Sequence, residues 1–239
     1  MAGQRNSCYN TGIHDTFTIR RDLFGVYETY IKAVGVNLSR KEYGEDTLWI
    51  KIFLRGYGII TGTAPSFGSR RGHFGGETEP FVWGEFTLKK KQKSPNYFIE
   101  DVDIKDDMLD IRWGRSPIVS AFKLSELVLK YLMPGQPDDV LMANLYWNMK
   151  LLTCRNIPVE VAEWRFVWSW LEEWGLAPDL VDFHRYRKFS DDEIVLLTKL
   201  SRLNYEGVRR LFSRPIGLDI RENALKIAVK RAIEFLDEK

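Results

Sequence analysis

The chain has 239 residues, of which 44% are hydrophobic and 28% charged, and its two cysteines exclude a disulfide framework or a cysteine-based zinc site. Residues 1–115 carry 17 basic and 15 acidic side chains, and residues 116–239 carry 18 of each. A site for a polyanion must therefore come from local clustering of cations. No apolar run reaches transmembrane length and the N-terminal residues lack a signal-peptide core, so we expect a cytoplasmic protein.

The first part of the chain has the hydrophobic pattern of short strands. Polar residues dominate the start, so residues 1–27 are predicted to be a loosely attached extension. Strands are predicted at residues 30–38, 47–54, 57–64, 81–90 and 96–104. The segment 47–54 alternates, with Leu48, Ile50, Ile52 and Leu54 on one face and Trp49, Lys51 and Phe53 on the other. Arg55-Gly56 is predicted to be a two-residue hairpin loop. Five short strands with glycine turns indicate a small closed barrel over residues 28–115.

Helical spacing replaces this pattern from about residue 116 onward. Helices are predicted at residues 117–132, 138–152, 158–174, 193–203, 204–212 and 219–236. Ser116 is predicted to cap the first helix, Ser190 to open a capping box with Glu193, and Trp174-Gly175 to end the third helix. The buried face of the first helix is predicted to hold Ile118, Phe122, Leu129 and Leu132. The sequence thus predicts an α+β protein, with an all-helical domain at residues 116–239.

The stretch SFGSRRGHFGGETEPFVWGEFTLKKKQK, residues 66–93, carries most of the chemistry that we predict. Its first part is too rich in glycine for a regular element, and its last part is a strand that ends in lysines. Guanidinium groups on a flexible backbone suit phosphate, because arginine binds oxyanions bidentately. The predicted phosphate contacts are Arg70, Arg71, His73, Lys89, Lys90, Lys91 and Lys93, with Arg40, Lys41 and Arg55 in support. Gly75, Gly76 and Pro80 are predicted to shape the loop. The alternative is a solvated hairpin loop with a charged end.

Aromatic residues are interleaved with these cations, as in barrels that bind single-stranded nucleic acid by stacking. They are Trp49, Phe53, Tyr57, Phe74, Trp83, Tyr97 and Phe98. Most aromatic residues in strands belong to a core, so the cations are the stronger candidates.

Two segments resemble the RecO family of bacterial recombination mediators. FGGETEPF, residues 74–81, is similar to the end of the family's basic loop, and KEYGEDTLWIKIFLRGYGIITGTAP, residues 41–65, to the strands before it. The resemblance implies that the barrel is an OB-fold. It also implies a mediator that binds single- and double-stranded DNA without sequence specificity, anneals strands, and with RecR helps load RecA onto DNA coated by single-stranded DNA-binding protein.

WLEEWGLAPDL, residues 170–180, also resembles the family, but the zinc-binding cysteines that follow it in most members are absent. His184 alone cannot form a tetrahedral site, so we expect no metal and no cofactor. The resemblance implies that the helical domain binds the acidic tail of single-stranded DNA-binding protein. Arg202, Arg209, Arg210 and Arg214 could surround a pocket for it.

No catalytic motif is present, and we expect no enzyme activity. The protein is expected in the cytoplasm, associated with the nucleoid and not with a membrane. Two alternatives remain: an OB-fold protein that binds RNA, and a scaffold whose barrel binds protein.

Overall fold

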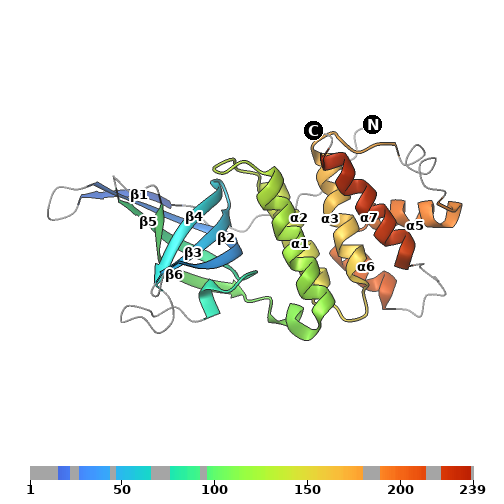
Figure 1. The fold of residues 1–239 in the computed structure, drawn as a ribbon, viewed down its shortest axis with the longest axis horizontal. Coiled ribbons are helices and arrows are strands. Elements are labelled where there is room, and N and C mark those ends of the chain that lie inside the picture. Colours follow the sequence, from blue (N-terminus) through green and yellow to red (C-terminus); the bar gives the residue numbers. More distant parts are fainter. Residues whose placement is uncertain are drawn as a thin grey trace.

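A β-barrel and a group of helices lie side by side along the long axis of the molecule (Figure 1). The computed structural model describes residues 16–21, 27–43, 47–65, 76–91, 96–179, 189–213 and 222–237. Strands precede helices in the chain, so the predicted fold class is confirmed.

Five of the six strands that the described residues form make up the barrel. The strands are β1 (Thr16–Arg21), β2 (Tyr27–Tyr43), β3 (Thr47–Leu54), β4 (Gly58–Pro65), β5 (Trp83–Lys91) and β6 (Tyr97–Asp106). Their order is β1-β2-β3-β4-β6-β5, and β5 also pairs with β2, which closes the barrel. The β4–β6 pair is parallel and the others are antiparallel. Leaving β1 aside, this is the Greek-key barrel of an OB-fold.

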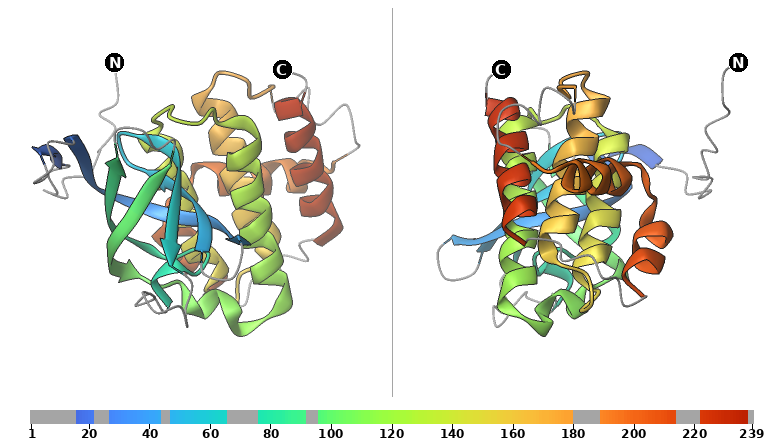
Figure 2. Two further views of the ribbon diagram at one scale, coloured as in Figure 1. Left: turned by 60° about the vertical axis from the view of Figure 1, so that its left-hand side comes forward. Right: turned by 90° about the vertical axis from the view of Figure 1, so that its right-hand side faces the viewer.

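Strand β2 is longer than predicted because it bends and pairs with three strands, β1, β3 and β5. A bulge between Asn37 and Ser39 interrupts its pairing with β3, while its first half pairs with β5. Strand β1 was not predicted, since its residues were assigned to the loosely attached extension. It pairs with residues 27–32 of β2 and projects on the side away from the helices (Figures 1 and 2).

The β3–β4 connection has three residues, 55–57, and the predicted two-residue loop is wrong. Gly56 and Gly58 both have positive φ angles, of 69° and 73°. A Cβ on Gly58 would also lie 2.2 Å from the carbonyl oxygen of Gln136, so this turn requires glycine twice.

The alternation predicted for β3 is confirmed. Leu48, Ile50, Ile52 and Leu54 lie in the barrel interior, together with residues such as Phe86, Leu88 and Ile99. Trp49 and Lys51 point outward into solvent. Phe53 also points outward but is buried, because the helices cover that end of the barrel.

The helices are α1 (Arg115–Tyr131), α2 (Asp139–Leu152), α3 (Val159–Glu173), α5 (Asp191–Arg202), α6 (Tyr205–Phe212) and α7 (Glu222–Asp237), with 3-10 turns η1 (Gly76–Thr78) and η2 (Leu109–Trp113). The capping box at Ser190 is confirmed. Helix α3 ends as predicted, with Gly175 at φ 69° and the Leu176 N–H donating to the Leu171 carbonyl at 2.7 Å. The predicted Ser116 cap is wrong, since α1 begins at Arg115 after Gly114.

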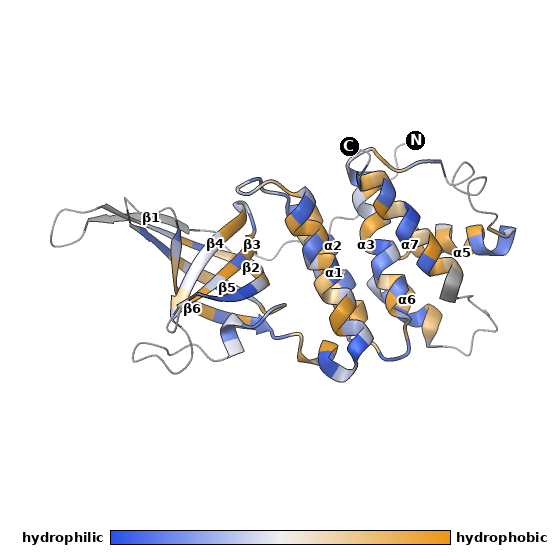
Figure 3. Ribbon diagram, in the orientation of Figure 1, coloured by the Kyte–Doolittle hydropathy of each residue, from blue (hydrophilic) through white to orange (hydrophobic). Residues whose placement is uncertain are grey.

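Helix α3 is the centre of the helical part and packs against α1, α2, α5 and α7. Its residues Trp164, Trp168 and Trp170 are buried. Helix α1 buries Ala121, Leu124 and Val128, whereas Phe122, predicted on that face, is 40% exposed. Orange and blue residues alternate along α1 and α2 in Figure 3, as expected for helices with one buried face.

The helical core continues onto the barrel without interruption. Val36, Leu38, Phe53, Ile59, Phe81 and Trp83 from the barrel belong to the same buried cluster as α1, α2 and α3. The boundary predicted at residues 115–116 stays a prediction, but the two parts share one core. Among the described helices, none has both the length and the hydropathy to cross a bilayer.

Candidate nucleic-acid interface

The lysines that end β5 lie at the end of the barrel far from the helices. Lys89 and Lys90 pair with Tyr30 and Thr29 of β2. The Lys89 Nζ lies 5.5 Å from the centre of the Tyr30 ring and 3.8 Å from Glu100. The Lys90 Nζ lies 4.9 Å from the centre of the Tyr97 ring.

Several predicted site residues lie outside the part of the chain that the structure describes. They are Arg70, Arg71, His73, Phe74, Gly75 and Lys93. The backbone of Lys91 belongs to β5 and pairs with Glu28. Gly76 begins the turn η1, and Pro80 follows it. Their predicted roles stay predictions.

A network of hydrogen bonds holds the chain where the predicted basic loop ends. The buried Asn37 side chain donates to the carbonyl oxygens of Thr78, at 2.5 Å, and Glu79, at 3.0 Å. The Glu79 carboxylate accepts from Arg40 and, at 3.5 Å, from Arg112. Arg40, predicted to contact phosphate, is therefore paired within the protein and ties β2 to this segment.

Arg55 lies at the opposite end of the barrel from the lysines. Its Nε is 3.6 Å from the Asp139 carboxylate, which also accepts from the Gly56 N–H at 2.9 Å. Val34, which accepts from the Arg55 N–H, is opposite Glu85, four residues before Lys89. Four strand residues span about 13 Å. Arg55 therefore joins the barrel to α2 and does not share the surface formed by the lysines.

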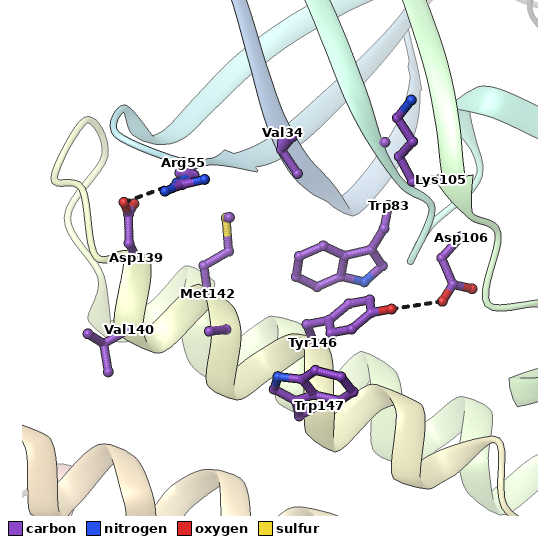
Figure 4. A pocket seen from close by; sticks show the side chains of 12 residues that line it. Val34, Arg55, Trp83, Lys105, Asp106, Asp139, Val140, Met142, Tyr146 and Trp147 are labelled. Carbon is purple, nitrogen blue, oxygen red and sulfur yellow. Dashed lines mark hydrogen bonds and ion pairs between the residues drawn. The ribbon is translucent and has the colours of Figure 1, made fainter. Parts of the chain in front are cut away.

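Arg55 also borders a cleft of about 600 Å³ between the barrel and α2 (Figure 4). The lining is Val34, Arg55, Trp83, Gly84, Lys105, Asp106, Asp139, Val140, Met142, Ala143, Tyr146 and Trp147. The Tyr146 hydroxyl donates to Asp106 at 3.2 Å, and Lys150 donates to the same carboxylate at 2.8 Å. Burial, and then the Asp106 charge, raise the pKa of Tyr146. The charges around this mostly apolar cleft are thus balanced.

A row of paired residues crosses the outer face of the barrel, and its middle member, Thr63, is buried. The strand registers join Lys41 to Trp49, Trp49 to Thr63, Thr63 to Phe98, and Phe98 to Lys89. Residues directly opposite each other in a sheet project from the same face. We call these five residues the outer row. It brings together two predicted cations and two predicted aromatic residues from five different strands.

The predicted aromatic residues divide into two groups. Phe53 and Trp83 are core residues, and Tyr57 and Tyr97 are partly buried against the barrel interior. Trp49 and Phe98 are 40% and 52% exposed.

Sequence reasoning missed Tyr43, which is 61% exposed and stacks on Trp49 at 4.7 Å between ring centres. Tyr43 lies two residues after Lys41, and alternate residues of a strand share a face, so Tyr43 is on the outer face. This could be seen only once β2 was known to extend to Tyr43.

The arginines predicted to surround a pocket in the helical part do not line the cleft between the barrel and α2. Arg202, Arg209 and Arg210 are exposed. Arg209 pairs with Glu206 at 3.3 Å and lies 5.5 Å from the centre of the Tyr205 ring. Arg214 is outside the described residues. The pocket stays a prediction.

The described residues contain no group of three or more histidine, cysteine or acidic side chains that could hold a metal ion. The segment 180–188, which contains His184, is outside them.

The fold and this surface define an OB-fold protein with cations and aromatic rings on the exposed part of its barrel. Residues 29–107 match the family model "Recombination protein O N terminal", and this range runs from β2 to the end of β6. The barrel is thus a RecO N-terminal domain, and the resemblance described above is confirmed for this part of the chain. This domain supports a RecO-family protein with a role in DNA recombination and repair. No curated protein matches the chain.

Proposed function

We propose that this protein is a recombination mediator whose barrel binds single- and double-stranded DNA without sequence specificity. The observation that carries the proposal is the outer row, which begins and ends in a lysine on a barrel of the RecO family. Lys51 lies two residues after Trp49, on the same face of β3, and is also exposed. Cations spaced in this way contact phosphates, which carry no sequence information.

The same chemistry supports annealing. Two DNA strands repel each other, and cations that contact both phosphate backbones lower this repulsion. The barrel needs no catalytic group for this, and we propose that the protein has no enzyme activity of its own.

The partners that we propose rest on the family and not on a surface of this chain. They are RecR, RecA and the tail of single-stranded DNA-binding protein, at DNA in the cytoplasm. The test is the rate of RecA filament assembly on DNA coated by single-stranded DNA-binding protein, with RecR and with or without this protein. An unchanged rate would contradict the mediator role.

DNA binding is tested by fluorescence anisotropy of labelled oligonucleotides over a series of salt concentrations. The variant Lys89→Ala/Lys90→Ala/Lys91→Ala removes the cations that end β5. If all three contact phosphate, the slope of log K against log salt on single strands falls by about 2. The matched control is Lys199→Ala/Lys230→Ala, which removes exposed lysines from α5 and α7.

Wild-type protein that binds no DNA even at low salt would contradict the proposal and favour a barrel that binds protein. Tighter binding to RNA than to DNA of equal length would favour the RNA-binding alternative.

A further inference from the structure

The outer row has a spacing that suits consecutive unpaired nucleotides. Neighbouring strands lie about 4.8 Å apart, so Trp49 and Phe98, separated by Thr63 on β4, are about 10 Å apart along the sheet. The path from Lys41 to Lys89 along the row is about 19 Å and curves around the closed barrel. Single OB-folds bind about 4 to 16 nucleotides, and a row of this length fits the lower end of that range.

The two rings, Trp49 and Phe98, are exposed side chains in the part of the chain that the structure describes. Trp49 and Phe53 lie on the same face of β3, and only Phe53 is buried by the helices. Phe98 is the most exposed phenylalanine among the described residues, at 52%. Exposed rings that form a contiguous apolar patch mark binding sites.

Tyr43 extends the Trp49 platform. The planes of the two rings are inclined by 18° and their centres are 4.7 Å apart, so they form a parallel stack. A cross-strand pair of this kind also stabilises the β2–β3 hairpin. The stack nevertheless leaves Tyr43 61% exposed, and a flat base can add to a stack that already exists.

The charges near the row favour rings over phosphate contacts at one end. Lys89 lies 3.8 Å from Glu100, which is exposed on the same strand as Phe98. This carboxylate weakens the attraction that Lys89 exerts on a phosphate. At this end of the row, a nucleotide would gain more from stacking on Phe98 than from the nearby lysine.

We propose that the outer row is a stacking site for unpaired bases, with Trp49 (extended by Tyr43) and Phe98 as two platforms and Lys41, Lys51 and Lys89 beside the phosphates. This inference rests on the proposed function and adds to it a preference for single-stranded over double-stranded DNA. Bases in a duplex are already stacked on one another and cannot reach these rings. The rings therefore make the barrel prefer single strands, whereas the lysines bind single and double strands alike.

The test compares three ligands of equal length and label: an oligo-dT of about 12 nucleotides, the same strand with abasic sites throughout, and a duplex. The abasic strand keeps every phosphate and removes every base. The variants are Trp49→Ala, Phe98→Ala and their combination, with Trp49→Phe as the conservative change that keeps a ring. Trp174→Ala, which removes a ring of 37% exposure from the helical part, is the matched control.

Wild-type protein should bind oligo-dT tighter than the abasic strand, and each alanine should reduce oligo-dT affinity about fivefold or more. Affinity for the abasic strand and for the duplex should change less than twofold. Trp49→Phe should retain most of the preference, which a loss of folding would not allow. The double variant should bind oligo-dT and abasic strands equally.

Three results would overturn the inference. The first is a wild-type affinity that does not depend on the bases, and the second is an equal loss on all three ligands in the alanine variants. In both cases salt-dependent binding would leave the proposed DNA-binding function standing. The third is an absence of any binding at low salt, which would contradict the proposed function itself.

Discussion

Asn37 offers the sharpest test of how the barrel holds the end of the predicted basic loop. Its side chain is fully buried at the bulge of β2 and donates both amide hydrogens to carbonyl oxygens, of Thr78 and Glu79. The Asn37 backbone also accepts from the Phe81 N–H at 2.8 Å, and Phe81 has an unusual φ of 73°. Asn37→Ala removes the side-chain bonds and leaves the backbone bonds in place.

The cost of this change follows from the two acceptors. The Glu79 carbonyl keeps a bond from the Val82 N–H at 3.4 Å, so there only a hydrogen bond of about 1 kcal/mol is lost. The Thr78 carbonyl loses its donor in a buried place, which costs about 1–3 kcal/mol. The change also removes the buried Asn37 Oδ1, which accepts no hydrogen bond from the described residues and so offsets part of this cost. We therefore expect Asn37→Ala to lower the free energy of unfolding by about 1–3 kcal/mol.

Urea denaturation followed by circular dichroism measures this difference. Asn156→Ala is the matched control, because the Asn156 side chain also donates to a backbone carbonyl, of Phe212 at 3.0 Å, but is exposed. It should cost about 1 kcal/mol or less. A loose anchor for the segment before Gly76 should also weaken oligonucleotide binding, about two- to tenfold. Equal destabilisation by the two alanines would refute the reasoning.

Three further predictions concern the helical part. Ser190→Ala removes the cap of α5 and should lower stability by about 1 kcal/mol in urea denaturation, whereas no change would show that the cap contributes nothing. Glu163→Ala leaves the buried Ser120 hydroxyl without its acceptor, now at 2.7 Å, and should cost about 1–3 kcal/mol in the same assay. A hydrogen bond from Lys130 holds the pKa of Asp237 below its ordinary value of 3.8. The contribution of this ion pair to the stability of the fold is complete above pH 3.8 and is lost as the pH falls through the lower folded-state pKa. An NMR titration should find this pKa below 3.8 and higher in Lys130→Ala, and a value at or above 3.8 in the wild type would contradict the pairing.

The elements that the sequence predicted well are those that local chemistry determines. Strand β3 has a strict alternation of two, and the start of α5 and the end of α3 each carry a specific capping residue. These signals lie within a few residues of the feature that they specify. The bounds of most other elements shifted by one to three residues, which is the usual uncertainty of helix ends.

The features that the sequence could not predict depend on residues far apart in the chain. The length of β2 is set by its pairing with both β3 and β5, and β1 pairs with the edge of β2 that β3 leaves open. Arg40 and Arg55 looked like free cations, but Glu79 and Asp139 engage them from elsewhere in the chain. A charge count cannot reveal such partners.

The outer face of β3 is buried at one end and exposed at the other, and this difference shows how the helices define the candidate site. Trp49, Lys51 and Phe53 alternate along the same outer face, and sequence alone cannot tell them apart. The helices cover the barrel from Phe53 toward Trp83, and this burial stabilises the shared core. The surface that remains for a ligand is the other end, where Trp49, Phe98 and Lys89 face outward. By taking one end of the barrel for packing, the helical part leaves the opposite end for the DNA binding that we propose.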